Sequence, residues 1–143
     1  MRGKYLFLSR ICGMAATVVF ALSACGGDGG TGPVIPATGT WSGTTSQSLA
    51  VSFNITSQGI TSATLDYQLS GSFCSYNATV TVGGSAPVPI TNGQFNTGSI
   101  QIGGSATMSA TGRFTSSTQA NGTISIVDGG CNGSVNLTWN ATR

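Results

Sequence analysis

Between Gly39 and Arg143, apolar residues recur at every second position, in runs separated by turn residues. A period of two is typical of β-strands that bury one face and expose the other. The pattern therefore predicts an all-β domain of eight or nine short antiparallel strands packed as a single β-sandwich, with an up-and-down barrel as the alternative. The alternating sets are Leu49, Val51, Phe53 and Ile55; Leu65, Tyr67 and Leu69; Tyr76, Ala78, Val80 and Val82; Ile100 and Ile102; Met108 and Ala110; Ile124 and Ile126; and Val135, Leu137 and Trp139.

Dipeptides that favour tight turns separate these runs. They are Gln58-Gly59, Gly83-Gly84, Asn92-Gly93, Gly103-Gly104, Asn121-Gly122 and Gly129-Gly130. Pro87 and Pro89 flank Val88, and proline has no amide hydrogen to donate to a neighbouring strand. This segment is therefore predicted to be a loop or an edge strand.

The first 24 residues have the pattern of an export signal. Arg2, Lys4 and Arg10 supply positive charge, and residues 11–22 are apolar or small. Twelve helical residues span about 18 Å, which is short of a hydrocarbon core of about 30 Å. A helical signal peptide is therefore expected over residues 1–24, rather than a stable transmembrane helix.

Leu22, Ser23, Ala24 and Cys25 resemble the lipobox of bacterial lipoproteins. The resemblance implies that a diacylglycerol, with chains such as palmitate, is attached to the Cys25 thiol, and that the signal is cut before this residue. Gly26 follows in place of the Asp that resembles an inner-membrane retention signal, so the outer membrane is favoured if the host has two membranes. The alternative is an ordinary secretory signal cut near Ala24.

Residues 26–38, which are rich in Gly and Pro, have no apolar periodicity. They predict a flexible tether after the lipidated Cys25, with a stiffer part between Pro33 and Pro36. Three segments are therefore expected: a signal peptide (1–24), the lipidated cysteine with its linker (25–38) and an all-β domain (39–143).

Charged residues make up only 6% of the chain, and there is no His and no Glu. Three of the five basic residues lie in the signal, so the remaining side chains carry two Arg against three Asp. This composition argues against nucleic acid as a partner, and no cofactor or metal site is expected. Asp66 and Asp128 are the only acids of the domain and are not expected to act as a catalytic pair. Arg113 is expected on a solvated face, or paired with Asp66 or Asp128.

The four cysteines divide by location. Cys12 lies in the signal, and Cys25 is assigned to lipidation. Cys74 and Cys131 remain in an exported domain, where disulfides persist. A Cys74–Cys131 disulfide is therefore predicted.

From about Val51 to Arg143, the chain is similar to a small, uncharacterised all-β domain that recurs in exported bacterial proteins. The similarity lies in a strand with Cys74, in Pro89-Ile90-Thr91-Asn92-Gly93-Gln94-Phe95, Gly112-Arg113-Phe114-Thr115-Ser116 and Ala120-Asn121-Gly122-Thr123-Ile124, and in Cys131 and Trp139-Asn140-Ala141-Thr142-Arg143. It implies a compact, disulfide-bonded β-sandwich and no particular chemistry.

Gly39-Thr40-Trp41 also resembles the start of the first strand of lipocalins and avidin-like barrels. In lipocalins a late Arg packs on this Trp, a role that Arg143 would take here. The internal tryptophans of the avidin site are missing. Paired first and last strands, each with a core Trp (Trp41 and Trp139), explain both residues more simply.

The sequence thus predicts a non-enzymatic lipoprotein of the cell envelope, facing the periplasm or the cell exterior. Besides the membrane that holds its lipid anchor, we expect a binding or structural role with an unknown envelope or extracellular partner. A glycan held by polar loops and by Phe73, Tyr76 and Phe95 is the partner considered first. The alternative is a lipocalin-like (calycin) carrier of a small apolar ligand, which requires a barrel with a hollow interior.

Overall fold

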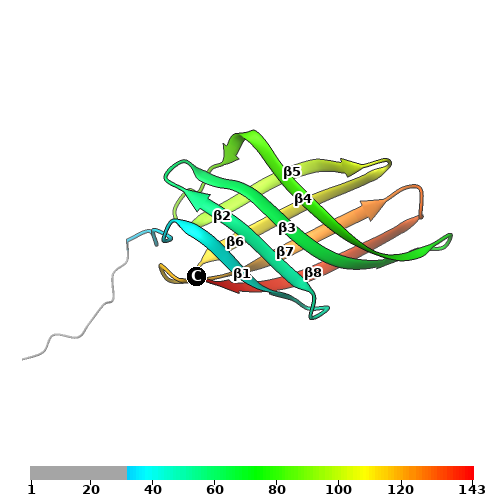
Figure 1. Ribbon diagram of the computed structural model, residues 1–143, viewed down its shortest axis with the longest axis horizontal. Helices are drawn as coiled ribbons and strands as arrows, with labels where there is room; N and C mark the ends of the chain where they lie inside the picture. The colour runs from blue at the N-terminus through cyan, green and yellow to red at the C-terminus, as the bar shows by residue number, and fades with distance from the viewer. Residues whose placement is uncertain (1–31) are drawn as a thin grey trace, which may run out of the picture. The chain divides into compact units, whose positions relative to one another are not determined.

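The computed structural model describes residues 32–143 (Figure 1). The signal peptide and Cys25, with the three residues before it, lie outside the described residues. The segment Thr31–Arg143 forms one compact unit. It contains eight strands: β1 (Gly39–Thr45), β2 (Ala50–Thr56), β3 (Gly59–Ser70), β4 (Ser75–Val88), β5 (Gln94–Gly103), β6 (Ala106–Phe114), β7 (Gln119–Asp128) and β8 (Gly133–Thr142).

All eight strands belong to one antiparallel sheet with the order β4-β3-β2-β1-β8-β7-β6-β5. Each half of the chain is a four-stranded meander, and the first and last strands join the two meanders through pairs such as Gly43 with Ala141. β4 and β5 are therefore the two edges of the sheet, although they follow each other in the chain. The all-β prediction is confirmed, with eight strands, of which β3 and β4 reach 12 and 14 residues.

The sheet curls until its two halves face each other across one core, and it nearly closes into a barrel (Figure 1). Phe53 of β2 lies 6.4 Å from Phe95 of β5 and 6.5 Å from Phe114 of β6, measured between ring centroids. These strands are far apart in the sheet order, so only a curled sheet brings their rings together. The facing halves resemble the layers of a sandwich, while the strand order is that of an up-and-down barrel.

The alternating apolar residues point into this core, as their period predicts. Trp41 and Trp139 are both buried, on the paired strands β1 and β8, as expected. The indole nitrogen of Trp41 donates a hydrogen bond to the carbonyl oxygen of Ala37 at 2.9 Å. The Ala37 amide in turn donates to the carbonyl oxygen of Ser117. The last part of the predicted flexible linker is thus held against the barrel.

Two predicted turns lie inside strands instead. Gly83-Gly84 falls within β4, where the register with β3 shifts between Ile60 and Ser62 and leaves room for extra residues in β4. Gly122 falls within β7, paired with Gly112 of β6 and Trp139 of β8. A Cβ at Gly122 would overlap the Trp139 ring and the Thr111 carbonyl oxygen, so glycine serves packing there and not a turn.

The other turn predictions agree with the structure. Thr91 and Gln94 exchange backbone hydrogen bonds around Asn92-Gly93, whose φ angles are 52° and 71°. Positive φ at both central residues is the requirement of a type I′ hairpin, which Asn-Gly meets well. Val88 lies at the end of an edge strand, as Pro87 and Pro89 predicted.

Candidate binding site

An apolar cavity of about 220 Å³ lies inside the barrel, beside the two edge strands. Its wall comes from both halves of the sheet. The residues that contribute are Val51, Phe53, Ile60, Thr61, Ser62, Ala63, Thr64, Leu65, Val80, Val82, Gly83, Gly84, Ala86, Val88, Phe95, Thr97, Ile100, Met108, Ala110, Ile124 and Trp139. None of these residues, all within the described range 32–143, carries a charge.

The cavity exists because small residues stand where the alternation points inward. Ala63 of β3 and Ala110 of β6 take inward positions between larger neighbours and are only partly buried. Gly83 and Gly84 of β4 add no side chain that would fill the space. Small residues on three strands therefore leave a hollow that the larger core residues do not reach.

Packed aromatic rings close one end of this hollow. The Phe95 and Trp139 rings stack at 6.0 Å between centroids, and Phe53 meets Trp139 edge to face at 5.6 Å. Gly112 leaves room for both stacked rings, since a Cβ there would overlap them. This cluster forms a floor at the end of the barrel that carries the β4–β5 connection.

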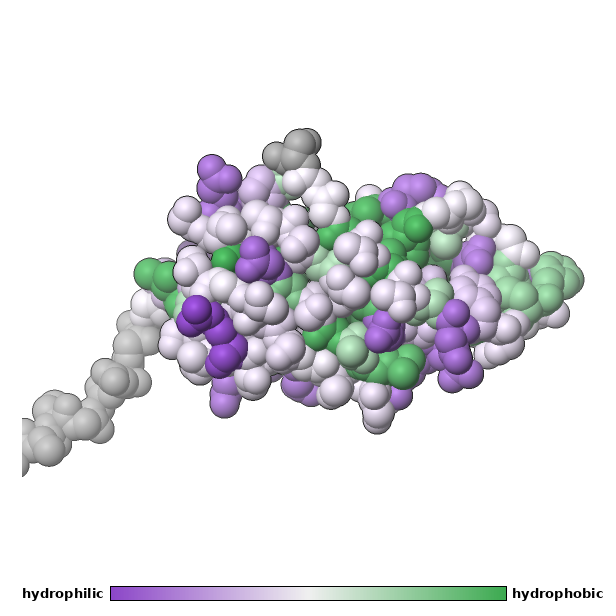
Figure 2. All heavy atoms as spheres, in the orientation of Figure 1, coloured by the Kyte–Doolittle hydropathy of each residue, from purple (hydrophilic) through white to green (hydrophobic). Residues whose placement is uncertain are grey.

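The side of the cavity opens between β4 and β5, the two edge strands of the sheet that residues 32–143 form. We call this opening the seam. Gly83, Gly84, Ala86 and Val88 lie on its β4 side, and Phe95, Thr97 and Ile100 on its β5 side. In the view of Figure 2, hydrophobic residues reach the surface among residues of intermediate hydropathy near the middle of the molecule. The cavity is therefore open toward the side of the barrel.

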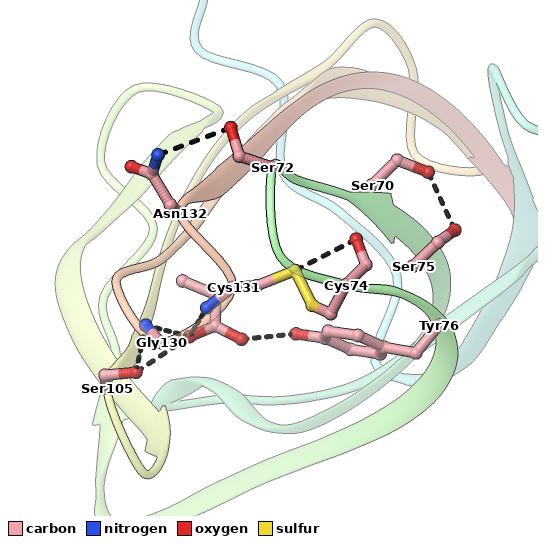
Figure 3. Close-up of a disulfide and its surroundings, with 10 residues drawn as sticks. Ser70, Ser72, Cys74, Ser75, Tyr76, Ser105, Gly130, Cys131 and Asn132 are labelled. Atoms are coloured by element: carbon pink, nitrogen blue, oxygen red, sulfur yellow. Dashed lines mark hydrogen bonds between the residues drawn. A yellow bond between two sulfur atoms is a disulfide. The ribbon is translucent and has the colours of Figure 1, made fainter.

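At the far end of the seam, one carboxylate ties the strands together. Asp128, at the end of β7, accepts hydrogen bonds from the Tyr76 hydroxyl of β4 and the Ser105 hydroxyl, both at 2.8 Å. It also accepts the backbone amides of Gly130 and Cys131 at 2.9 and 3.4 Å. Figure 3 shows Tyr76, Ser105 and Gly130 turned toward this one carboxylate. Ser105 lies in the β5–β6 turn, so Asp128 bridges the β4 edge to the hairpin of the β5 edge.

These contacts shift both pKa values in the expected directions. The hydrogen bonds from Ser105 and then Tyr76 lower the pKa of Asp128, because they favour its charged form. Burial, and then the hydrogen bond to Asp128, raise the pKa of Tyr76 well above its usual range. At neutral pH the pair is therefore a neutral phenol that donates to a carboxylate.

Cys74 and Cys131 form the predicted disulfide at the same end of the barrel (Figure 3). Cys74 lies in the β3–β4 connection and Cys131 in the β7–β8 turn, with Cα atoms 5.2 Å apart. The backbone adds to this link, because the Phe73 amide donates to the Cys131 carbonyl oxygen. The disulfide and the Asp128 contacts together hold the end of the barrel where β4 begins.

The structure does not bring Asp66 and Asp128 together. Asp66 takes an outward position on β3 and accepts a hydrogen bond from Thr79 at 2.6 Å. Asp128 takes an inward position on β7 and meets the inward-facing Tyr76. The two carboxylates thus lie on opposite faces of the sheet. Arg113 of β6 is exposed, which agrees with the solvated face expected for it.

Arg143 lies beside Gly39, two residues before Trp41. Its side chain is exposed, and among the contacts of residues 32–143 there is no cation–π contact between Arg143 and Trp41. The core packing of Trp41 instead comes from Phe53 and Phe114. The lipocalin-like role of a late Arg is therefore not reproduced in this geometry.

The three aromatics expected at a glycan surface are separated. Phe73 is 78% exposed in the loop beside the disulfide. The Tyr76 ring packs edge to face against the Tyr67 ring inside the barrel, with 6.2 Å between ring centroids. Phe95 lies at the other end, in the aromatic floor of the cavity. They do not form a shared platform.

Within residues 32–143, no three His, Cys, Asp or Glu side chains lie close enough together to hold a metal ion. No helix in this range is long and apolar enough to span a membrane.

The fold and the cavity define a disulfide-bonded, eight-stranded β-domain with an apolar interior site and a lateral opening. Comparisons with protein-family models, curated proteins and solved structures found no match.

Sequence reasoning did not identify the cavity. The alternation identified its walls as core residues, and a filled core shows the same alternation as a hollow one. The sequence feature that could have indicated the cavity is the set of small residues at inward positions of different strands, above all Ala63 and Ala110. Its meaning depends on the strand order, which places β3 and β6 on facing sides of the barrel.

Proposed function

We propose that this protein is a lipid-anchored binding protein of the cell envelope that holds a small apolar ligand in its barrel. The single observation that carries the binding role is the apolar cavity of about 220 Å³ with its opening at the seam. Binding sites for small molecules are typically concave and mostly apolar. This is the carrier role considered as an alternative from the sequence.

The location rests on the sequence. The signal and the lipobox-like Leu22-Ser23-Ala24-Cys25 support export and attachment of acyl chains to Cys25. More than one acyl chain gives stable anchoring, whereas a single chain is marginal. A Cys74–Cys131 disulfide fits an oxidising compartment. The glycan role is not carried forward, because its three aromatics lie at separate places.

A fluorescent apolar probe tests the binding role. The segment Thr31–Arg143 contains the whole sheet, its core and its disulfide, so it is expected to fold by itself. N-phenyl-1-naphthylamine is uncharged and emits strongly only in apolar surroundings. We expect saturable binding of one probe per chain, with quenching of Trp139, which lines the cavity.

Two variants localise the binding. Ala110→Phe places a ring in the cavity, and Ala86→Phe does so from the exposed β4 edge, where the core is not disturbed. Both are expected to weaken probe binding at least tenfold. Thr107→Phe is the matched control, since Thr107 lies on β6 with outward parity and does not line the cavity. Absence of saturable binding, or equal affinity in all three variants, rejects the binding role.

A further inference from the structure

The cavity is elongated, and this shape restricts which ligands fit it. Its lining follows β3 from Ile60 to Leu65 and β5 from Phe95 to Ile100. Each stretch contains a register shift and lies beside only four residue steps of its neighbouring strand, Val51 to Ile55 and Met108 to Gly112. Four steps along a strand span about 13 Å. The volume of about 220 Å³ is therefore drawn out along the seam and is not a round hollow.

The depth of the cavity is limited. Met108 and Ile124 form its inner wall and are both buried, with exposed fractions of 5%. The stacked Phe95 and Trp139 rings block extension at one end. A long, shallow slot with these walls accommodates a single extended chain better than a compact ring system.

The polar groups at the rim of the cavity are few, and the hydroxyls of Thr61 and Thr97 already form hydrogen bonds within the protein. The Thr97 hydroxyl accepts the Ala110 amide and donates to the Gly98 carbonyl oxygen, both within 2.9 Å. The Thr61 hydroxyl donates to the Asn54 carbonyl oxygen at 3.4 Å. None of the lining residues in the described part of the chain is charged, so a charged end group inside the slot would lose hydration without gaining an ionic partner.

We propose that the ligand is a single unbranched hydrocarbon chain with an uncharged polar end, lying along the seam between β4 and β5. The chain lies against the apolar floor and walls, and the polar end lies within the slot beside the threonine hydroxyls, partly removed from water. Apolar burial supplies the binding free energy, because the walls offer little else. This inference rests on the proposed function, since it assigns a ligand class to the same cavity.

Competition against the bound N-phenyl-1-naphthylamine tests the ligand class. Four competitors isolate end group and shape: 1-decanol, decanoate and decyltrimethylammonium share one chain, and 1-adamantanemethanol has a similar carbon count in a compact cage. All four are used below their aggregation limits with the Thr31–Arg143 segment at neutral pH. We expect 1-decanol to displace the probe with an affinity at least tenfold higher than each of the others.

The variants then assign the effect to the slot. Ala110→Phe and Ala86→Phe are expected to weaken 1-decanol binding at least tenfold, and Thr107→Phe to leave it within twofold. Decanoate or decyltrimethylammonium binding as tightly as 1-decanol overturns the uncharged end group. Tighter binding of 1-adamantanemethanol overturns the extended chain. Either result with the probe still bound leaves the proposed function intact, whereas loss of probe binding rejects both.

Discussion

Asp128 connects three parts of the barrel through one side chain. Its carboxylate accepts hydrogen bonds from the hydroxyls of Tyr76 in β4 and Ser105 in the β5–β6 turn, and from two backbone amides of its own turn. The sequence predicted only the local part, an Asp-Gly-Gly turn. The contact with Tyr76 spans 52 positions and depends on how the sheet curls.

Acid is expected to weaken the folded state through Asp128. The pKa of Asp128 is lowered in the folded state, first by Ser105. Its contribution to stability is therefore present above the unfolded pKa of about 4 and is lost as pH falls below it. Urea unfolding at pH 7 and at about pH 3 should show a smaller drop in midpoint for Asp128→Asn than for the natural chain.

Asp66→Asn is the matched control for this experiment. It removes the other carboxylate of the domain but leaves the Asp128 contacts in place. If Asp128→Asn and the natural chain lose stability equally in acid, the Asp128 contacts do not contribute as described.

Gly122 shows why a glycine in a strand need not mark a turn. Replacement by Ala is expected to cost about 1–3 kcal/mol, because the added Cβ meets the Thr111 carbonyl oxygen and the Trp139 ring. Gly129→Ala is the control, since a Cβ there meets only ordinary contacts. It should stay within about 0.5 kcal/mol of the natural chain. Denaturant unfolding of both variants makes the comparison, and similar costs would contradict the packing role of Gly122.

At the scale of elements, local chemistry decided some turns and packing decided others. Asn92-Gly93 forms a turn in the β4–β5 connection because both residues adopt positive φ and the backbone groups of Thr91 and Gln94 close the turn. Asn121-Gly122 is the same dipeptide, but it lies in β7 between β6 and β8, and the hydrogen bonds to these two strands keep it extended. Dipeptide preference is a local property, whereas strand continuation depends on partners far along the chain.

The disulfide links the β3–β4 and β7–β8 connections through Cys74 and Cys131, which are 57 positions apart in the sequence. In the chain-entropy account, a loop of this length contributes about 4 kcal/mol. The double variant Cys74→Ala, Cys131→Ala should lose stability of that order in urea unfolding. The natural chain measured with a reductant should match it, while the reductant should leave the double variant unchanged. A loss well under 1 kcal/mol would show that the hydrogen bonds at this end hold it without the disulfide.

At the scale of the whole molecule, the first test concerns attachment to the membrane. The resemblance to a lipobox predicts that Cys25→Ala stays uncut and takes up no labelled palmitate when the full chain is expressed in a bacterial host. The natural chain should be labelled and shortened, and Cys12→Ala serves as a thiol control. Normal processing of Cys25→Ala would indicate an ordinary secretory signal.

The sequence by itself determined the all-β class, most strand positions, the core tryptophans and the cysteine pair. These follow from short-range rules: a period of two, turn chemistry and the export context of two remaining thiols. Each can be read within one segment, or from residue type alone.

Only the tertiary structure decided the strand order, the cavity and the contacts around Asp128. The position of β4 and β5 at the two sheet edges is a property of how eight strands pair. The hollow arises because Ala63 and Ala110 come to face the same space from opposite sides. Alternation fixes which side of a strand is buried, but the space between facing strands depends on the curl of the whole sheet.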